Sequence, residues 1–256
     1  MSTWTRSRNP MSRDRQSDEV RSRVVAAALQ LFIEKGYENA TIRQISERSG
    51  VSSGSIYHFF SDKEGVFQHL TLQMFETTLQ VAEHRAERHK DAYLTLALKW
   101  AYLVRLFSAD KRVAELFSVA YRSWKISREL LRAAASRHQK LLGTVLPDWN
   151  EDQFFIATLQ LGGVLSVLVD ERVNLDSLNE EKRIRALLSI ALYAFGVEPD
   201  RIQGLIQKAI KLLPPIAGLT TGLGMGNINL RGPADDSNAR LQPRKAVGVN
   251  APKNAR

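Results

Sequence analysis

Small hydroxyl side chains near position 53 are the residues whose chemistry first suggests a function. Ser52, Ser53 and Ser55 surround Gly54, so this segment carries hydrogen-bonding groups on a chain with little bulk. Such an edge can approach DNA base edges closely, and its hydroxyls can donate and accept hydrogen bonds there. We therefore interpret positions 52–55 as a segment that contacts bases or allows the backbone to approach them.

Residues on both sides of this segment carry groups suited to phosphate oxygens. Tyr57 and His58 follow about one helical turn later, and Thr41 and Arg43 precede it. Lys63 stands near the start of the next expected helix, where its charge and the helix N-terminus both attract an anion. We predict that these five residues contact the DNA backbone.

The elements that must position these residues are two short helices within 41–60. Thr41 and Gln44 have the spacing of a capping box, and Gly50 stands where the first helix should end in a left-handed residue. Ser52 or Ser53 can cap the second helix. A helix, a short glycine-containing turn and a second helix are typical of a helix-turn-helix. On spacing alone, an ordinary helical hairpin with serine caps stays open.

The segment Val24–Phe67 resembles the N-terminal DNA-binding domain of the TetR family of transcriptional regulators. The matching residues are AALQLFIEKGYENATIRQISERSGVSSGSIYHFFSDKEGVF, and the resemblance covers roughly residues 18–78. One departure is that Phe59 stands where many members have His, with His58 one place earlier. The resemblance implies an all-α fold, in which a three-helix helix-turn-helix domain (18–78) precedes a helical effector-binding and dimerisation domain (79–213).

The helices around the motif follow the same pattern. A helix is predicted over about 18–35, with Val25, Ala28 and Phe32 on its buried face. Ser61 and Glu64 predict a second capping box that opens a long helix through about residue 87. The resemblance implies that this long helix links the two domains. Its movement would then change the separation of two recognition helices in a dimer.

The second expected domain carries aromatic residues that could line a pocket for an apolar or aromatic effector. Each of them has an ordinary core position as the alternative. Late apolar helices, from about 151 and over 179–195, are where the family builds a dimer interface, and an intramolecular helix pair is the alternative there. The pocket candidates are Trp100, Phe107, Phe117, Tyr121 and Trp124.

Composition sets the remaining bounds on the 256-residue chain. It has no Cys, which excludes disulfides and favours the cytoplasm. The net charge is +9, of which residues 1–23 hold +3 and residues 214–256 hold +4. We expect a disordered basic arm over 1–17 and a disordered basic tail over 214–256, and Met11 is a second candidate start. No apolar run approaches the ~18 residues of a membrane span.

Enzyme signatures do not emerge from the sequence. It has no HExxH or Cys/His zinc spacing, nucleophile elbow or Walker loop, and the glycines at 222, 224 and 226 lack the strand and helix of a phosphate loop. We therefore expect no catalytic residue, metal or cofactor. The prediction is a homodimeric repressor that a small-molecule ligand releases from a palindromic operator. An activator, a ligand-independent DNA binder and a helical lipid- or small-molecule-binding protein with a vestigial helix-turn-helix are the alternatives.

Overall fold

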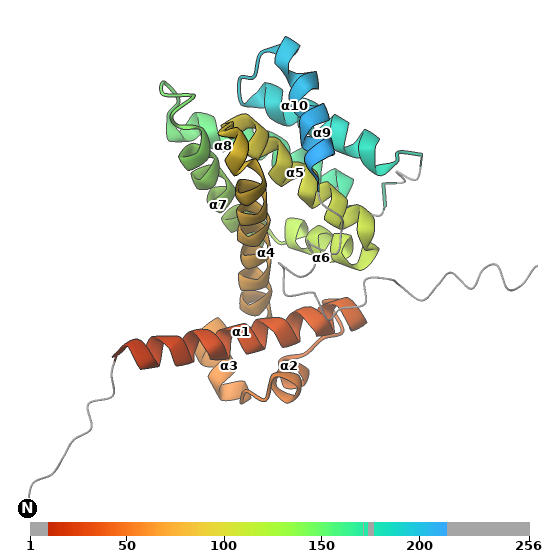
Figure 1. Cartoon of the computed structure of the whole chain (residues 1–256). Coiled ribbons are helices and arrows are strands. Elements are labelled where there is room, and N and C mark those ends of the chain that lie inside the picture. The colour runs from red at the N-terminus through yellow and green to blue at the C-terminus, as the bar shows by residue number, and fades with distance from the viewer. Residues whose placement is uncertain (1–9, 171, 174–176, 214–256) are drawn as a thin grey trace, which may run out of the picture.

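The computed structural model describes residues 10–170, 172–173 and 177–213, and every regular element in this part is helical. A lower layer holds the first three helices, with α1 lying across α2 and α3 (Figure 1). Helix α4 rises from this layer into an upper bundle formed by α5 to α10. The all-α prediction is confirmed. Residues 1–9 of the expected arm and the expected tail over 214–256 lie outside the described residues.

The lower layer consists of α1 (Pro10–Lys35), α2 (Ile42–Ser49) and α3 (Ser53–Phe60). Helix α1 begins at Pro10 and not near Asp18, so the prediction of disorder is wrong for residues 10–17. Proline suits the first turn of a helix, because its missing N–H would have no intrahelical partner there. The consequence is a longer α1 beside the helix-turn-helix.

A small apolar core holds these three helices together. Val24 and Ala28 of α1, Ile45 of α2 and Ile56 of α3 are fully buried. Phe32 of α1 meets Phe67 of α4 edge-on, with ring centroids 5.5 Å apart. The first turn of the linker helix is therefore part of the same core as the helix-turn-helix.

The caps of α2 agree with the sequence. Thr41 Oγ1 accepts the N–H of Gln44 at 3.2 Å, and the Gln44 side chain accepts the N–H of Thr41 at 3.1 Å. Gly50 ends α2 with φ of 65°, a conformation that favours glycine. The predicted capping box and left-handed turn are both confirmed.

The start of α4 differs from the prediction. Asp62, and not Ser61, is the N-cap, and its carboxylate accepts the N–H of Gly65 at 2.6 Å. Ser61 instead ends α3 with φ of 62°. Glu64 does not reach back to close a box, because its carboxylate accepts the Ser123 hydroxyl at 2.7 Å.

The upper bundle is built around α5, whose side chains are buried along most of its length. Helix α7 packs along α8, and α9 and α10 cover α5. The bounds are α4 Lys63–Ala86, η1 Glu87–His89, α5 Ala92–Ala109, α6 Lys111–Arg122, α7 Trp124–Leu142, α8 Glu151–Leu168, α9 Glu180–Ala194 and α10 Pro199–Leu212.

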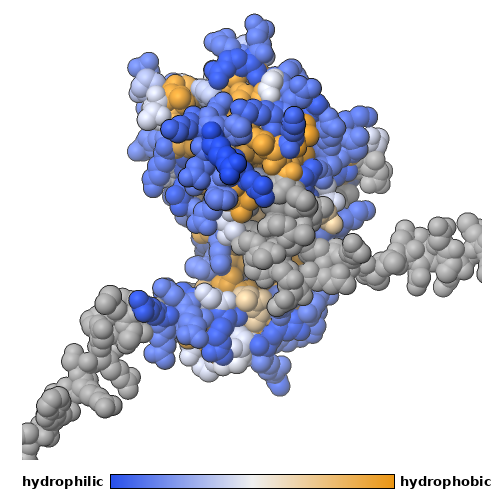
Figure 2. Space-filling view, in the orientation of Figure 1, coloured by the Kyte–Doolittle hydropathy of each residue, from blue (hydrophilic) through white to orange (hydrophobic). Residues whose placement is uncertain are grey.

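The outer face of α8 and α9 leaves large apolar side chains exposed. Figure 2 shows apolar side chains breaking the hydrophilic surface of the upper bundle and of the waist beneath it. The exposed apolar residues lie on both α8 and α9. They are Ile156, Leu159, Val167, Ile190 and Tyr193, each at least 44% exposed.

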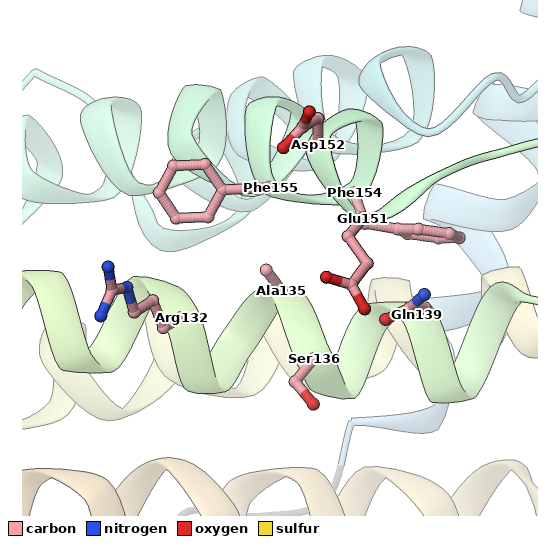
Figure 3. A pocket seen from close by; sticks show the side chains of 8 residues that line it. All are labelled: Arg132, Ala135, Ser136, Gln139, Glu151, Asp152, Phe154 and Phe155. Carbon is pink, nitrogen blue, oxygen red and sulfur yellow. The ribbon is translucent and has the colours of Figure 1, made fainter.

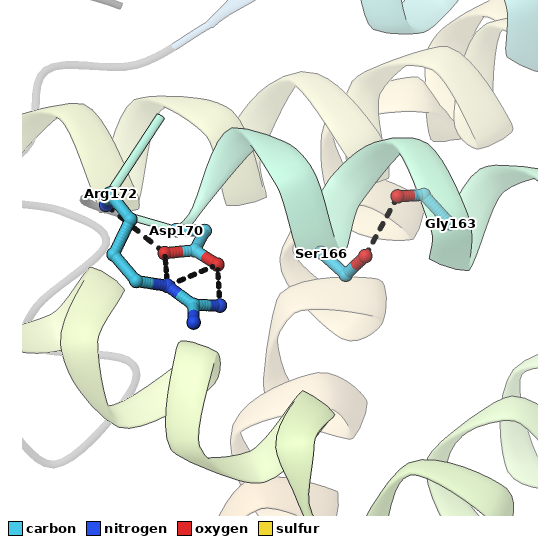
Figure 4. A network of polar contacts seen from close by, with 4 residues as sticks. All are labelled: Gly163, Ser166, Asp170 and Arg172. Atoms are coloured by element: carbon cyan, nitrogen blue, oxygen red, sulfur yellow. Dashed lines mark hydrogen bonds and ion pairs between the residues drawn. The ribbon is translucent and has the colours of Figure 1, made fainter. Parts of the chain in front are cut away.

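Local polar contacts close the end of α8 (Figure 4). The Ser166 hydroxyl donates to the carbonyl of Gly163 at 2.8 Å. Beyond the helix, the Arg172 guanidinium and backbone N–H both donate to the carboxylate of Asp170. The Arg172 contacts lower the pKa of Asp170 to about 2, so this turn keeps its charge pair at neutral pH.

Candidate nucleic-acid interface and effector cavity

The leading turn of α3 forms an open, small-residue edge. Ser52 caps the helix by accepting the N–H of Ser55 at 3.2 Å, and the two hydroxyls lie 2.9 Å apart. Ser53 is half-buried and Gly54 is exposed, with no atom within 4 Å of the position a Cβ on Gly54 would take. The turn is therefore open enough for close approach by a groove of DNA, and the contacts of Ser53, Gly54 and Ser55 with DNA stay a prediction.

Apolar contacts with the core and polar contacts with α1 hold α3 in place. Ile56 and Phe60 face the core, while the Arg23 guanidinium of α1 donates to the Ser49 carbonyl at 2.7 Å. Arg21 lies over the ring of Phe59, 5.2 Å from its centroid. Helix α1 therefore fixes both the turn before α3 and the end of α3.

An open groove of about 510 Å³ runs between the N-terminal half of α1 and α3. Gln16, Ser17 and Arg23 line it from α1, opposite Ser52 and Ser55. Sequence analysis did not place α1 beside the reading turn, because α1 was expected to begin only at Asp18. The run of arginines before residue 18 was the available signal.

The residues predicted to contact phosphates differ in their exposure and in whether their polar groups already have partners within the protein. Tyr57 is 53% exposed and His58 is also exposed, so both side chains can reach a ligand. Arg43 is exposed but forms an ion pair with Glu47 at 3.0 Å. The Thr41 hydroxyl already accepts the capping hydrogen bond of α2.

Lys63 forms hydrogen bonds within the protein that the sequence did not predict. Its ammonium donates to the carbonyls of Tyr37 at 2.9 Å and Glu38 at 3.3 Å. It also lies 4.2 Å from the centroid of the Tyr37 ring. An ammonium has three donors, so one N–H remains for a phosphate while the other two join α4 to the loop before α2.

Three of the five predicted pocket residues meet at a small internal cavity. Trp100, Phe117 and Tyr121 line a space of about 20 Å³ between α4, α5, α6, α7 and α8. Phe107 lies behind Phe117, with ring centroids 4.7 Å apart, and does not line the space. The prediction for Trp124 is wrong: it is 70% exposed and lies under Arg128, because Ile126 and Leu130 occupy the buried face of α7.

A chain of buried polar groups ends at the wall of this cavity. Lys99 is fully buried, and its Nζ lies 3.2 Å from Nε2 of His138. Nδ1 of His138 lies 2.8 Å from the hydroxyl of Thr158, which lines the cavity. Burial lowers the pKa of Lys99 and of His138 well below their usual values. Sequence analysis missed Lys99, although a single Lys inside an apolar helix was a signal.

A larger groove of about 490 Å³ opens on the surface between α7 and α8. In Figure 3, Phe155 and Glu151 project from α8 toward α7, while Asp152 points away from it. Arg132 and Gln139 lie on the α7 side of the groove. The groove is open and its polar groups are spread apart, so the internal cavity is the better candidate for an effector.

The described residues contain neither a cluster of three metal-ligating side chains nor a helix long and apolar enough to span a membrane. The fold and the site define a two-domain helical protein with an N-terminal helix-turn-helix. Residues 24–70 match the family described as bacterial regulatory proteins, tetR family. This part of the chain therefore carries the DNA-binding domain that the family model describes.

Curated relatives are similar to part of the chain. The HTH-type transcriptional repressor AcnR of Corynebacterium diphtheriae is 47% identical over 47 residues, which cover 18% of this chain and 25% of the relative. The regulator BetI of Cronobacter sakazakii is 32% identical over 123 residues, 48% of this chain and 56% of BetI. The chain thus spans only a quarter to about half of these relatives.

The similarity to solved structures extends over both domains. RolR in complex with resorcinol has a TM-score of 0.58 at 20% identity, over 79% of this chain and 99% of that one. A TetR-family protein from Syntrophomonas wolfei has a TM-score of 0.55 at 21% identity, over 72% and 99%. At this identity the likeness concerns the fold.

Proposed function

We propose that the protein is a homodimeric repressor that binds a palindromic operator through α3 and is released from it by a small-molecule effector. The open turn at Ser53, Gly54 and Ser55 carries this proposal, since it combines hydroxyls with room for close approach. Tyr57, His58 and Lys63 would hold the backbone on one side, and Thr41 and Arg43 on the other. Such a regulator would act in the cytoplasm.

The exposed face of α8 and α9 supports a dimer. Its apolar side chains, such as Leu159 at 49% and Tyr193 at 70% exposure, lie on two neighbouring helices. A second copy would bury them in a four-helix contact. Two recognition helices could then occupy successive major grooves, which lie about 34–36 Å apart.

The dimer can be tested with two outward substitutions. Leu159→Asp combined with Tyr193→Asp should convert the dimer to a monomer in analytical ultracentrifugation, because the charges would be buried without partners. Operator affinity should fall with it. Val145→Asp, at another exposed apolar position (45%), is the control. A double variant that stays dimeric would place the interface elsewhere.

A continuous set of contacts could carry a change in the cavity to the DNA-binding domain. Tyr121 lines the cavity, and Ser123, two residues later, ends α6 and begins α7. The Ser123 hydroxyl donates to Glu64 at 2.7 Å, and Lys125 Nζ lies 3.7 Å from the same carboxylate. Since Lys63 joins the loop before α2, movement at the end of α6 would shift the helix-turn-helix.

A genomic pull-down tests the function directly. The purified protein would be mixed with fragmented genomic DNA at about 150 mM salt, where nonspecific binding is weak, and the retained fragments sequenced. We expect a few fragments that share an inverted repeat. Retention of all fragments would support a nonspecific binder, and retention of none would contradict DNA binding.

A further inference from the structure

Polar groups at the cavity wall and directly behind it include donors with few acceptors. Lys99 is one of them: it does not line the cavity but lies against Phe75 and Trp100, which do. Thr158 donates its single hydroxyl proton to the carbonyl of Phe154 at 2.7 Å. It must therefore accept from Nδ1–H of His138, which leaves Nε2 as an acceptor for Lys99. His138 is thus neutral, and it takes only one of the hydrogens that the Lys99 amine can donate.

No carboxylate in the described part of the chain forms an ion pair with Lys99. Glu76 of α4 is nearby, but it is paired with Arg137 of α7 at 2.5 Å. Burial lowers the pKa of Lys99 more than the charges of Glu76 and Glu83 raise it, and Arg137 also opposes protonation. The amine otherwise faces the rings of Phe75, at 3.8 Å, and Trp100, at 4.9 Å.

Two further groups at the cavity wall are also donors. The indole Nε1 of Trp100 is buried and has no hydrogen-bond partner. Burial raises the pKa of the Tyr121 phenol, so its oxygen keeps its proton. A buried donor without an acceptor is costly. A ligand that supplies acceptors and negative charge would satisfy these donors.

We propose that the effector is a small aromatic acid whose carboxylate pairs with the Lys99 ammonium while its ring lies among the cavity walls. This proposal rests on the proposed effector-released regulator and names the chemical class of that effector. The remaining walls are apolar, which suits a ring. They include Phe75, Leu103, Phe117, Leu130 and Leu131.

The present size of the cavity couples binding to movement. A space of about 20 Å³ accommodates about one water molecule. A ring can enter only if the walls separate, and these walls include Phe75 on α4 and Tyr121 at the end of α6. The acid therefore displaces the two helices that contact the DNA-binding domain.

Binding of the acid also takes up a proton. The free protein holds Lys99 as an amine at pH values above its lowered pKa. The carboxylate and one proton from solvent then give the paired ammonium and carboxylate, with no other change in charge. Affinity for the acid should consequently fall as pH rises.

Isothermal titration calorimetry on the full chain tests the class of effector. The probes are benzoate, phenylacetate and 1-naphthoate, each with its amide, and benzamidine as the cation. We expect acids to bind and the matched amides and benzamidine to bind roughly tenfold more weakly or not at all. Acid titrations in two buffers with different ionisation enthalpies should show proton uptake approaching one per site.

Lys99→Met keeps an unbranched apolar side chain as far as the Cε position and removes the nitrogen. It should lose roughly tenfold or more in affinity for the acids and abolish the proton uptake, while Lys140→Met, an exposed lysine on α7, should change neither. The uptake measurement needs only the wild type, so it stands if Lys99→Met does not fold.

Equal binding of acids and amides, an acid panel without a binder, or absence of proton uptake would overturn the proposal. The pull-down is run on the same preparation. If the protein retains operator fragments but binds no acid, only the proposed class of effector is rejected. If it neither retains fragments nor binds an acid, the proposed function is rejected as well.

Discussion

Two lysines, one in each domain, show how differently the two parts of the molecule treat a partly or fully buried charge. Lys63 is half-buried, and its ammonium donates to two backbone carbonyls beside an aromatic ring. Lys99 is fully buried, and its hydrogen-bond partner is a neutral imidazole. The first arrangement fixes two segments together. The second gives the amine one acceptor, Nε2 of His138, although the amine has further hydrogens to donate.

The two domains also differ in how closely their helices pack. At Gly65 the first turn of α4 presses directly on the end of α3, whereas the upper bundle contains a cavity between five helices. Close packing transmits displacement, and a cavity admits a ligand. A closely packed DNA-binding domain joined to a bundle with a cavity would suit the ligand-controlled regulator that we propose.

The largest expected effect tests the rigid contact at Gly65. A Cβ at this position would lie 1.9 Å from the Phe60 carbonyl oxygen, so Gly65→Ala must separate α3 and α4. We expect a loss of about 3 kcal/mol or more in unfolding free energy, measured by urea denaturation. Gly204→Ala in α10 meets no atom within 4 Å and should stabilise by about 1 kcal/mol. Equal effects of the two would contradict a tight junction.

The core behind the recognition helix should respond nearly as strongly. Ile56 is fully buried, so Ile56→Ala should cost roughly 2–5 kcal/mol and weaken operator binding without removing a DNA contact. Val145→Ala, at a position 45% exposed, should stay within about 0.5 kcal/mol. Chemical denaturation gives both values. A small loss at Ile56 would show that the first domain is not closely packed.

The pH dependence of the unfolding free energy should report the burial of Lys99 in the second domain. Burial lowers the pKa of Lys99, so between that pKa and 10.5 the unfolded chain binds more protons than the folded one. Stability therefore rises with pH in this window and is lost as pH falls. Lys99→Met should remove up to about 1.4 kcal/mol per pH unit of this slope, and Lys140→Met should leave it unchanged. Identical slopes in Lys99→Met and wild type would mean that Lys99 is not forced toward its neutral form.

The smallest effect concerns Lys63, the lysine of the first domain. Lys63→Ala removes hydrogen bonds to Tyr37 and Glu38 at a half-buried site, and should cost about 1 kcal/mol of stability. It should also weaken binding to all DNA sequences and lower the salt slope by about one, because one N–H remains for a phosphate. Fluorescence anisotropy across salt concentrations measures the slope. A loss of stability with an unchanged slope would limit Lys63 to positioning.

Local features were readable from the sequence because they depend on residues close in the chain. The capping box of Thr41 and Gln44 and the turn at Gly50 each involve neighbours within a few positions, and both are confirmed. The capping box expected at Ser61 and Glu64 is absent for the opposite reason. Glu64 bonds to Ser123, 59 residues away, and no local pattern reveals that partner.

The sequence by itself therefore determined the all-α class, the helix-turn-helix and the small edge that α3 presents. Only the tertiary structure decided which aromatic residues line a cavity, separating Trp100 and Tyr121 from the exposed Trp124. It also joined His138 to Lys99, 39 residues away, and to Thr158 on a third helix. The reason is physical: helical periodicity predicts which face of a helix is buried, but only the packing of several helices decides which buried polar groups meet and whether they lack a partner.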